Sequence, residues 1–469
     1  MGPHTLRRVL IASAAALVAG IGTTGTAWAF SPVHTAPAPH TLPSNARFYT
    51  PPPAPGSLQQ AVSLIIKGDF KDAALLAKVI ITPQAVWFNG GTAAQVDLSV
   101  RQTVIRASAV HSVPVLVLYN IPGRDCSQYS SGGAGSDAAY QGWIGGVVKG
   151  LGNANAIVLV EPDGLANLPS DCPSAYPGAD IAALTSSRIA DVVYAGQQLE
   201  SHDRNVLVYL DAGHSAWHSA GDMSSRLYQA GVGAVQGFFL NVSNYQYTVN
   251  SSDYGTWLSD CLALATPLNS QGVAVNAGDF GDCGDEYYNG GPATSWAGGA
   301  MNPYGQWTSG NADLTLNTAG VNSRYALELG TVQPTAHFVV DTSRNGNGPN
   351  NMSAYGNSPF NQPAGVVSSL ASGNWCNNPA AGLGVKPTAS TGVPLLDAYL
   401  WVKTPGQSDG QCDIAGGARA WDYTVYNPWN WNATQQTQND PLWGLQDPAA
   451  GAWFPQMVLT LVHQANPPL

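Results

Sequence analysis

The sequence predicts an α/β protein, a distorted seven-stranded parallel β/α barrel that forms a single domain over residues 57–469. Two observations support this fold class. Short apolar runs rich in Val, Ile and Leu recur along the chain, and helix-like stretches with apolar residues at three- and four-residue spacing lie between most of them. Near-continuous hydrophobic strands that alternate with helices indicate a parallel sheet covered on both faces.

Seven segments fit the strand pattern, and each is rich in β-branched or aromatic residues. They are 78–88, 113–120, 156–163, 205–214, 237–245, 337–346 and 396–403. Segments 96–110 and 184–199 carry the helical spacing. Polar residues follow the carboxyl ends of the strands, where a closed barrel builds its site. An open doubly wound sheet is the alternative, but the glycine-rich fingerprint expected after its first strand is missing.

The start of the chain has the features of an export signal. Arg7 and Arg8 precede the apolar run VLIASAAALVAGIG, and Ala27-Trp28-Ala29 fits a small-residue cleavage site. We expect residues 1–29 to be a signal peptide, followed by a Pro-rich segment over 30–56. The mature protein is expected to be secreted, with no membrane association, and monomeric.

Composition excludes some partners and favours others. The chain of 469 residues has a net charge of -11 with only 18 Lys and Arg, so clustered cations for nucleic acid are missing. Low charge and many Trp, Tyr, Asn and Gly residues suit a neutral, hydroxyl-rich ligand. Six cysteines with no CxxC pair favour disulfides over a metal site. Of the 15 possible connectivities, we expect sequence order: Cys126–Cys172, Cys261–Cys283 and Cys376–Cys412.

Carboxylates recur where the predicted strands end. Asp125, Asp163, Asp211 and Asp341 each follow an apolar run, and Asp409 lies in the loop after the last one. A single strand-end Asp is more often a capping or ion-pairing residue than a catalytic one. Several on one rim, with no His cluster nearby, favour acid/base chemistry on a neutral substrate. A glycosidic bond fits, because its leaving oxygen needs a proton and its transition state is oxocarbenium-like.

The residues also carry a family resemblance. YNIPGRDCSQYSSGGA (119–134), VEPDGLANL (160–168), YLDAGHSAW (209–217), NVSNY (241–245), WCN (375–377) and LWVKTPGQSDG (400–410) resemble glycoside hydrolase family 6 cellulases. The match is ordered and spans about residues 78–468. It implies a distorted seven-stranded barrel and inverting hydrolysis of cellulose or soluble β-1,4-glucan. We expect no cofactor and no metal, because the sequence contains no cluster of metal ligands.

The resemblance also implies roles for individual residues. Asp163 corresponds to the general acid, Asp125 to the partner that keeps it protonated, and Asp409 to the carboxylate often proposed as base. Ser131 corresponds to a water-positioning serine, Tyr119 to the residue that distorts the reactive sugar, and Asp211 to a further cleft carboxylate. The expected substrate contacts are Trp87, Asn89, His214, Trp217, Asn244, Trp375, Lys403 and Gln407. We expect Glu161 to support the site through hydrogen bonds.

Some features depart from the family pattern. Gln407 stands where a Glu is common, and segments 261–335 and 411–449 look longer than in compact members. QYSSGGA and NVSNY favour endoglucanase action, whereas the long loop after Asp409 favours cellobiohydrolase action from chain ends. A noncatalytic glucan-binding homologue, supported only by Gln407, and a hydrolase for another neutral β-glucan remain alternatives.

Overall fold

The computed structural model describes residues 42–202, 205–265, 280, 281, 283, 284, 292–294, 300–303 and 319–469. The predicted signal peptide therefore lies outside the described residues. A seven-stranded parallel sheet in the order β1-β2-β3-β4-β5-β8-β9 organises the rest. Its strands are β1 (Val86–Phe88), β2 (Val115–Leu118), β3 (Ala156–Val160), β4 (Val206–Asp211), β5 (Gly237–Leu240), β8 (His337–Asp341) and β9 (Leu396–Leu400).

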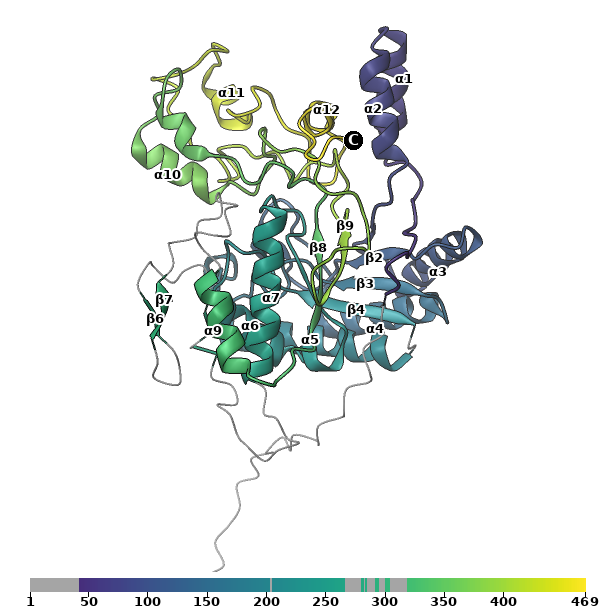
Figure 1. Ribbon diagram of the computed structural model, residues 1–469. Coiled ribbons are helices and arrows are strands. Elements are labelled where there is room, and N and C mark those ends of the chain that lie inside the picture. The colour runs from purple at the N-terminus through teal and green to yellow at the C-terminus, as the bar shows by residue number, and fades with distance from the viewer. Residues whose placement is uncertain are drawn as a thin grey trace, which may run out of the picture. The chain divides into compact units, whose positions relative to one another are not determined.

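Helices α3 (Ala93–Ala109), α4 (Asp137–Leu151), α5 (Ile181–His202), α6 (Ala220–Gln229), α7 (Thr248–Ala265) and α9 (Ala319–Leu329) lie around the strands (Figure 1). Helices α1 (Ser57–Ile66), α2 (Phe70–Ile80), α10 (Ala364–Ser372), α11 (Ala433–Gln438) and α12 (Pro455–His463) lie apart from the sheet. A small antiparallel pair, β6 (Pro292–Thr294) and β7 (Ala300–Pro303), lies within the long segment 261–335. None of the described helices combines the length and the hydrophobicity needed to cross a membrane.

The sheet curls into a distorted barrel, as predicted. Its end strands β1 and β9 are not paired as strands, but single hydrogen bonds link them. The N–H of Ala85 donates to the carbonyl of Trp401 at 2.9 Å, and the indole of Trp87 donates to the carbonyl of Val402 at 2.9 Å. The seven predicted strand segments each contain one observed strand. The first was predicted too long, because its residues 78–80 complete α2, where Val79 continues the buried face formed by Ala73 and Leu76.

Alternation along the strands divides the core in two. Val117, Leu159 and Tyr209 belong to a cluster contributed mainly by the strands, which fills the barrel interior. Leu116, Val158 and Leu210 pack with residues of the surrounding helices in a second, larger cluster. Successive strand residues point to opposite faces of the sheet, and both faces are buried. This is why every position of β2, β3 and β4 is apolar, up to the acidic end of β4.

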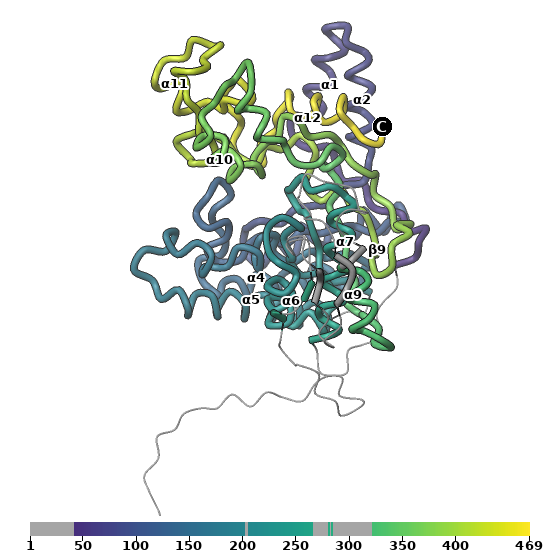
Figure 2. The backbone as a smooth tube through the Cα atoms, turned by 60° about the vertical axis from the view of Figure 1, so that its left-hand side comes forward, coloured from purple at the N-terminus to yellow at the C-terminus, as the bar shows by residue number. Residues whose placement is uncertain are grey.

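Two segments outside the alternating strands and helices complete the fold: the segment around Phe48 and the long segment 411–449. Phe48 is buried in the interior cluster, and the N–H of Tyr49 donates to the carbonyl of Val113 just before β2. The long segment 411–449 is mostly irregular and contains only the short helix α11. Its aromatic residues pack against Leu370 of α10, and α10 and α11 lie in the same part of the molecule in both views (Figures 1 and 2).

We expect the stacked pair Phe238 and Phe338 to contribute strongly to stability. The ring centroids lie 5.5 Å apart and the planes differ by 6°, and Phe338 is fully buried. Phe338→Ala should lower the free energy of unfolding by about 3–5 kcal/mol, because a large cavity opens between β8 and α7. Urea denaturation followed by circular dichroism measures this change.

Phe70→Ala is the matched control, because Phe70 is 67% exposed. Its free energy of unfolding should differ from that of the wild type by no more than about 0.5 kcal/mol. Equal effects of the two substitutions would contradict the central place of Phe338 in the core.

Candidate active site

The carboxyl ends of the strands border a cavity of about 490 Å³. Because all seven strands are parallel, the residues after β1, β2, β3, β4 and β9 meet at this one edge. The cavity brings together many of the predicted site residues. These are Trp87, Tyr119, Asp125, Asp163, His214, Trp217, Asn244, Trp375, Lys403 and Asp409.

Four predicted residues do not line this cavity. Asn89 borders a neighbouring cavity of about 430 Å³. Ser131 is exposed, and the adjacent Ser130 lines the main cavity instead. Asp211 is buried beneath the cavity, and the side chain of Gln407 is not among the lining groups.

Asp163 lies on a tight turn directly after β3. The backbone takes positive φ at Glu161 (54°) and Asp163 (64°), and the N–H of Gly164 closes the turn on the carbonyl of Glu161 at 2.8 Å. Burial raises the pKa of Asp163 well above its ordinary value, and the negative charges of Asp211 and Asp125 raise it further. The side chain is therefore a carboxylic acid that keeps its proton near neutral pH.

Glu161, just after β3, is hydrogen-bonded to the backbone just after β2. Its carboxylate accepts hydrogen bonds from the N–H groups of Asn120 and Ile121 at 2.8 and 2.9 Å. The residue is fully buried, and burial raises its pKa to about 7 despite these two bonds. It does not line the cavity, so its contacts fit the supporting role that we expected.

Asp211 lies under the turn that carries Asp163. Its carboxylate accepts hydrogen bonds from the N–H groups of Leu165 and Ala166 at 3.1 and 2.8 Å. It thereby fixes the chain just after Asp163 while adding negative charge beneath it. Its place is that of a positioning residue below the cavity.

Asp125 comes from the loop after β2. The N–H of Ser130 donates to its carboxylate at 2.6 Å, and the adjacent Cys126 is tied to Cys172 by a disulfide. Burial raises the pKa of Asp125 to about 6, with Ser130 and the charge of Arg124 opposing the shift. This carboxylate can exchange a proton close to neutral pH.

Asp409 has the opposite electrostatics. Its carboxylate contacts Arg344 at 2.9 Å and Lys403 at 3.2 Å, and it accepts a hydrogen bond from the hydroxyl of Tyr245 at 2.9 Å. Burial alone would raise the pKa of Asp409, but the two cations outweigh it and hold the pKa below its ordinary value. Asp409 is therefore ionised while Asp163 is protonated.

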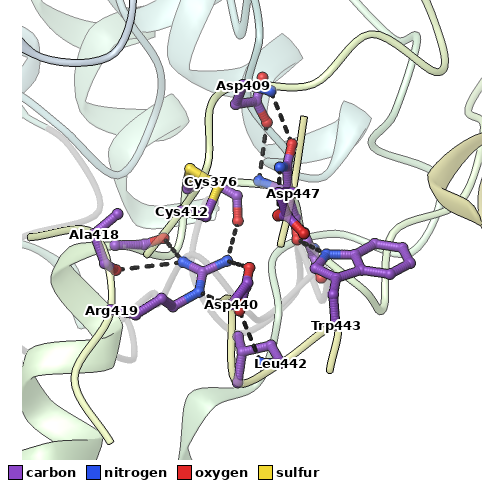
Figure 3. A network of polar contacts seen from close by, with 12 residues as sticks. Cys376, Asp409, Cys412, Ala418, Arg419, Asp440, Leu442, Trp443 and Asp447 are labelled. Atoms are coloured by element: carbon purple, nitrogen blue, oxygen red, sulfur yellow. Dashed lines mark hydrogen bonds and ion pairs between the residues drawn. A yellow bond between two sulfur atoms is a disulfide. The ribbon is translucent and has the colours of Figure 1, made fainter. Parts of the chain in front are cut away.

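A buried polar network lies behind Asp409 (Figure 3). Asn377 makes two hydrogen bonds with Asp409. Its backbone N–H donates to the Asp409 carboxylate at 3.0 Å, and its side-chain oxygen accepts the backbone N–H of Asp409 at 2.8 Å. Its amide also donates to Asp447 at 2.7 Å. Asp447 neighbours Asp440, which forms a fully buried ion pair with Arg419 at 3.1 Å.

The same network contains a possible ligand cluster for a metal ion. Cys412, Asp440 and Asp447 have candidate ligand atoms within 4.8 Å of one another. The sulfur of Cys412 is bonded to Cys376, however, and Asp440 is paired with Arg419. These groups therefore do not fit a metal. All three disulfides, including Cys261–Cys283, follow the predicted sequence order.

Aromatic side chains and a neutral histidine complete the cavity wall. Trp87 meets Tyr119 edge to face with centroids 5.5 Å apart, and His214 lies 5.4 Å from Trp217. Burial lowers the pKa of His214 to about 3, and its Nδ1 accepts the N–H of Ala216 at 3.2 Å. His214 is thus uncharged and is a hydrogen-bonding group, not a base.

Sequence reasoning missed Arg344, Tyr245 and Asn377. Arg344 follows the end of β8 by three residues, and Tyr245 and Asn377 close two of the quoted motifs. The signal that could have identified Arg344 is an arginine within a few residues of the end of an apolar strand, where the other site residues also lie. The contacts of Tyr245 and Asn377 with Asp409 join segments more than 30 residues apart, so no local pattern announces them.

Comparison with known proteins agrees with this geometry. The sequence model of "Glycosyl hydrolases family 6" matches residues 43–465. The chain belongs to this family. Among curated proteins, Endoglucanase A of Cellulomonas fimi is 32% identical over 351 residues, which cover 75% of this chain and 54% of that protein. The chain thus spans about half the length of that relative and 65% of Endoglucanase A of Thermobispora bispora.

Other family 6 relatives carry different names. A probable 1,4-β-D-glucan cellobiohydrolase C of Neosartorya fischeri is 29% identical, covering 75% of this chain and 62% of that protein. The solved endoglucanase Cel6 from Mycobacterium tuberculosis, in complex with methyl-cellobiosyl-4-deoxy-4-thio-β-D-cellobioside, is 28% identical with a TM-score of 0.56. That match covers 90% of this chain and 98% of the other.

Replacing Glu161 by Gln should change how stability depends on pH. The pKa of Glu161 is raised on folding, so the folded state binds its proton more tightly than the unfolded state. This contribution to stability is complete below the unfolded pKa of about 4.5 and is lost as pH rises towards about 7. Between these pH values Glu161→Gln should therefore gain about 3 kcal/mol relative to the wild type.

Urea denaturation at several pH values measures this difference. The exposed Asp180→Asn is the matched control and should follow the wild-type curve, since Asn also caps the helix start where Asp180 accepts the N–H of Ala183. A Glu161→Gln curve parallel to that of the wild type would mean that folding does not shift the pKa of Glu161.

Proposed function

We propose that this chain is an inverting β-1,4-glucanase that hydrolyses cellulose, with Asp163 as the general acid. The observation that carries the proposal is the opposite protonation of two carboxyl groups in one cavity. Asp163 is held protonated by burial and like charges, and Asp409 is held ionised by Arg344 and Lys403. Pairs of groups whose environments push their pKa values apart mark acid and base roles.

The mechanism follows from these two states. The glucan chain lies in the cavity against Trp87, Trp217 and Trp375, and Asp163 gives its proton to the bridging oxygen. As that bond breaks, positive charge develops on the sugar ring. The ionised Asp409 stabilises this charge, because attraction is strong in a site of low dielectric.

A water molecule then attacks the anomeric carbon from the face opposite the leaving oxygen, which inverts its configuration. The water must lose a proton. Asp125, with a pKa of about 6, is suited to receive it and to pass it back towards Asp163. Asp409 is the weaker base because its pKa lies below the ordinary value, so we assign it mainly to charge stabilisation. Ser130, whose backbone N–H donates to Asp125 and which lines the cavity, is a second candidate for the water-positioning role beside Ser131.

We favour internal cutting of the glucan chain. Curated relatives of this chain include endoglucanases at 28–32% identity, and the QYSSGGA and NVSNY motifs support the same subtype. Cellobiohydrolase action is the second candidate, because relatives with that name also match and the segment 411–449 is long. We further propose that the protein is exported, which the three disulfides support.

Removing the proton donor should abolish hydrolysis. Asp163→Ala is expected to release soluble sugar from phosphoric-acid-swollen cellulose at least about three orders of magnitude more slowly than the wild type. Asp180→Asn, which removes an exposed carboxyl that does not line the cavity, should leave the rate unchanged. Turnover near the wild-type rate in Asp163→Ala would refute the assignment.

Binding measured beside turnover separates an enzyme from a noncatalytic homologue. Native electrophoresis in gels that contain soluble β-1,4-glucan should retard both the wild type and Asp163→Ala, since the cavity walls are intact. Retardation of a wild-type protein that releases no sugar would favour the noncatalytic homologue.

Viscosity measurements distinguish internal cutting from release of cellobiose at chain ends. With carboxymethyl cellulose, we expect viscosity to fall steeply while few reducing ends have formed, because internal cuts shorten chains fastest. A slow fall in viscosity with cellobiose as the main product would assign the chain to the cellobiohydrolases.

A further inference from the structure

The segment 411–449 carries a pair of tryptophans that the proposed mechanism does not use. The rings of Trp429 and Trp431 are nearly parallel, with centroids 4.4 Å apart and planes 20° from each other. Both side chains are partly exposed, and neither lines the catalytic cavity. Tyr423 lies beside this pair, with its ring centroid 6.0 Å from that of Trp431.

Core packing does not account for the pair. Every other tryptophan in the described part of the chain belongs to a buried hydrophobic cluster or packs against one. Trp429 and Trp431 are in none of these clusters. Large aromatic side chains that are left outside the core and grouped together mark binding surfaces more often than isolated exposed ones do.

The indole N–H groups show the same distinction. Most tryptophans in the described ranges donate this hydrogen to a backbone or side-chain oxygen, as Trp421 does to the carbonyl of Tyr426 at 2.9 Å and Trp443 to that of Asn377 at 2.6 Å. Within those ranges, no donor bond is found for Trp429 or Trp431, nor for Trp217 and Trp375 of the cavity. The pair thus shares the lack of an indole hydrogen-bond acceptor with the two tryptophans that line the cavity, although the indole nitrogen of Trp429 packs against Gly444.

The sequence on either side of the pair is polar but uncharged. No Asp, Glu, Lys or Arg occurs between Asp422 and Asp440, where the sequence reads YTVYNPWNWNATQQTQN. Exposed amides and hydroxyls flank the rings, from Asn430, Asn432, Thr434 and Gln435. Indole faces with neighbouring amides and hydroxyls match a ligand that has apolar C–H faces and a rim of hydroxyls, and no charge.

The pair is held in a fixed conformation. Asn427 grips the backbone of Trp431 twice, accepting its N–H at 3.1 Å and donating to its carbonyl at 3.3 Å. Gln436 donates to the same carbonyl at 2.9 Å, and Asn432 and Gln435 cap the start of α11 reciprocally. Rings that are already ordered lose little entropy when a ligand binds.

The base of the segment is anchored to the wall of the catalytic cavity (Figure 3). Arg419, paired with the buried Asp440, donates to the carbonyls of Gly373 and Cys376 at 2.7 and 2.5 Å. These residues flank Trp375, which lines the cavity. The segment that carries the tryptophan pair is therefore fixed to the same wall as the site of hydrolysis.

We propose that Trp429 and Trp431, with the amides around them, form a second binding platform for a neutral β-1,4-glucan chain, outside the catalytic cavity. The identity of the glucan rests on the proposed function, whereas the platform itself rests on the tryptophan pair. A second contact on the same polymer raises the effective concentration of glucan at the cavity, so it strengthens binding of long or insoluble chains and not of short ones.

Binding isotherms on insoluble cellulose test the platform. Trp429→Ala/Trp431→Ala should bind at least about tenfold more weakly than the wild type, because buried tryptophans dominate binding energy at such contacts. Turnover of soluble cellotetraose, which fills only the cavity, should change by less than about twofold. Trp429→Phe/Trp431→Phe keeps the aromatic faces and should retain most of the binding.

Tyr228→Ala is the matched control, because Tyr228 is an aromatic residue on α6 that is 42% exposed. It should bind cellulose as the wild type does. An unchanged isotherm for the double alanine variant would overturn the proposal. So would equal losses of cellulose binding and cellotetraose turnover, since these would place the effect in the cavity or in the fold.

Thermal unfolding checks that the variants are folded. If the double alanine variant is unfolded, Trp431→Ala alone replaces it in the binding measurement, and weaker binding to cellulose is again expected. The result is independent of whether Asp163 catalyses hydrolysis. A wild type that binds cellulose through the pair but releases no sugar would refute the proposed function and leave the platform standing.

Discussion

The structure depends on an acid that must stay protonated in a site with other carboxylates. The negative charges of Asp211, Asp125 and Asp409 all raise the pKa of Asp163 at the carboxyl edge of the sheet. Burying like charges together is costly unless one of them remains neutral. The parallel barrel imposes this crowding, because it brings every strand end to the same edge, and the proton on Asp163 relieves it.

The cations of the site are distributed so that this proton stays on Asp163. Arg344 and Lys403 both contact Asp409, and the pKa of Asp409 falls below its ordinary value although the residue is buried. The charge of Lys403 lowers the pKa of Asp163 less than burial and the neighbouring carboxylates raise it. One cavity thus holds one carboxyl group with a raised pKa and one with a lowered pKa, and the difference comes from contacts between segments that are distant in sequence.

The long segment 411–449 is attached to this site by buried polar contacts and not by hydrophobic packing alone. The Arg419–Asp440 pair and Asn377 join the segment to the residues around Trp375 and Asp409. Breaking such a pair on one side leaves a buried charge without compensation. The segment and the cavity wall are therefore expected to keep one arrangement, which suits a surface that presents aromatic rings to a polymer.

The sequence alone determined the barrel and most of the cavity. Apolar runs such as residues 156–160 are buried on both faces whatever surrounds them, and parallel strands must deliver Asp163, Asp125 and Lys403 to one edge. Tertiary structure decided the protonation states and the supporting contacts. Whether Asp409 is ionised depends on Arg344, 65 residues away in sequence, and the backbone N–H of Ser130 reaches Asp125 because of the local turn. Charge, burial and hydrogen bonding act through space, so the family resemblance could name Asp163 as the protonated acid, but the contacts that raise its pKa and lower that of Asp409 come from the fold.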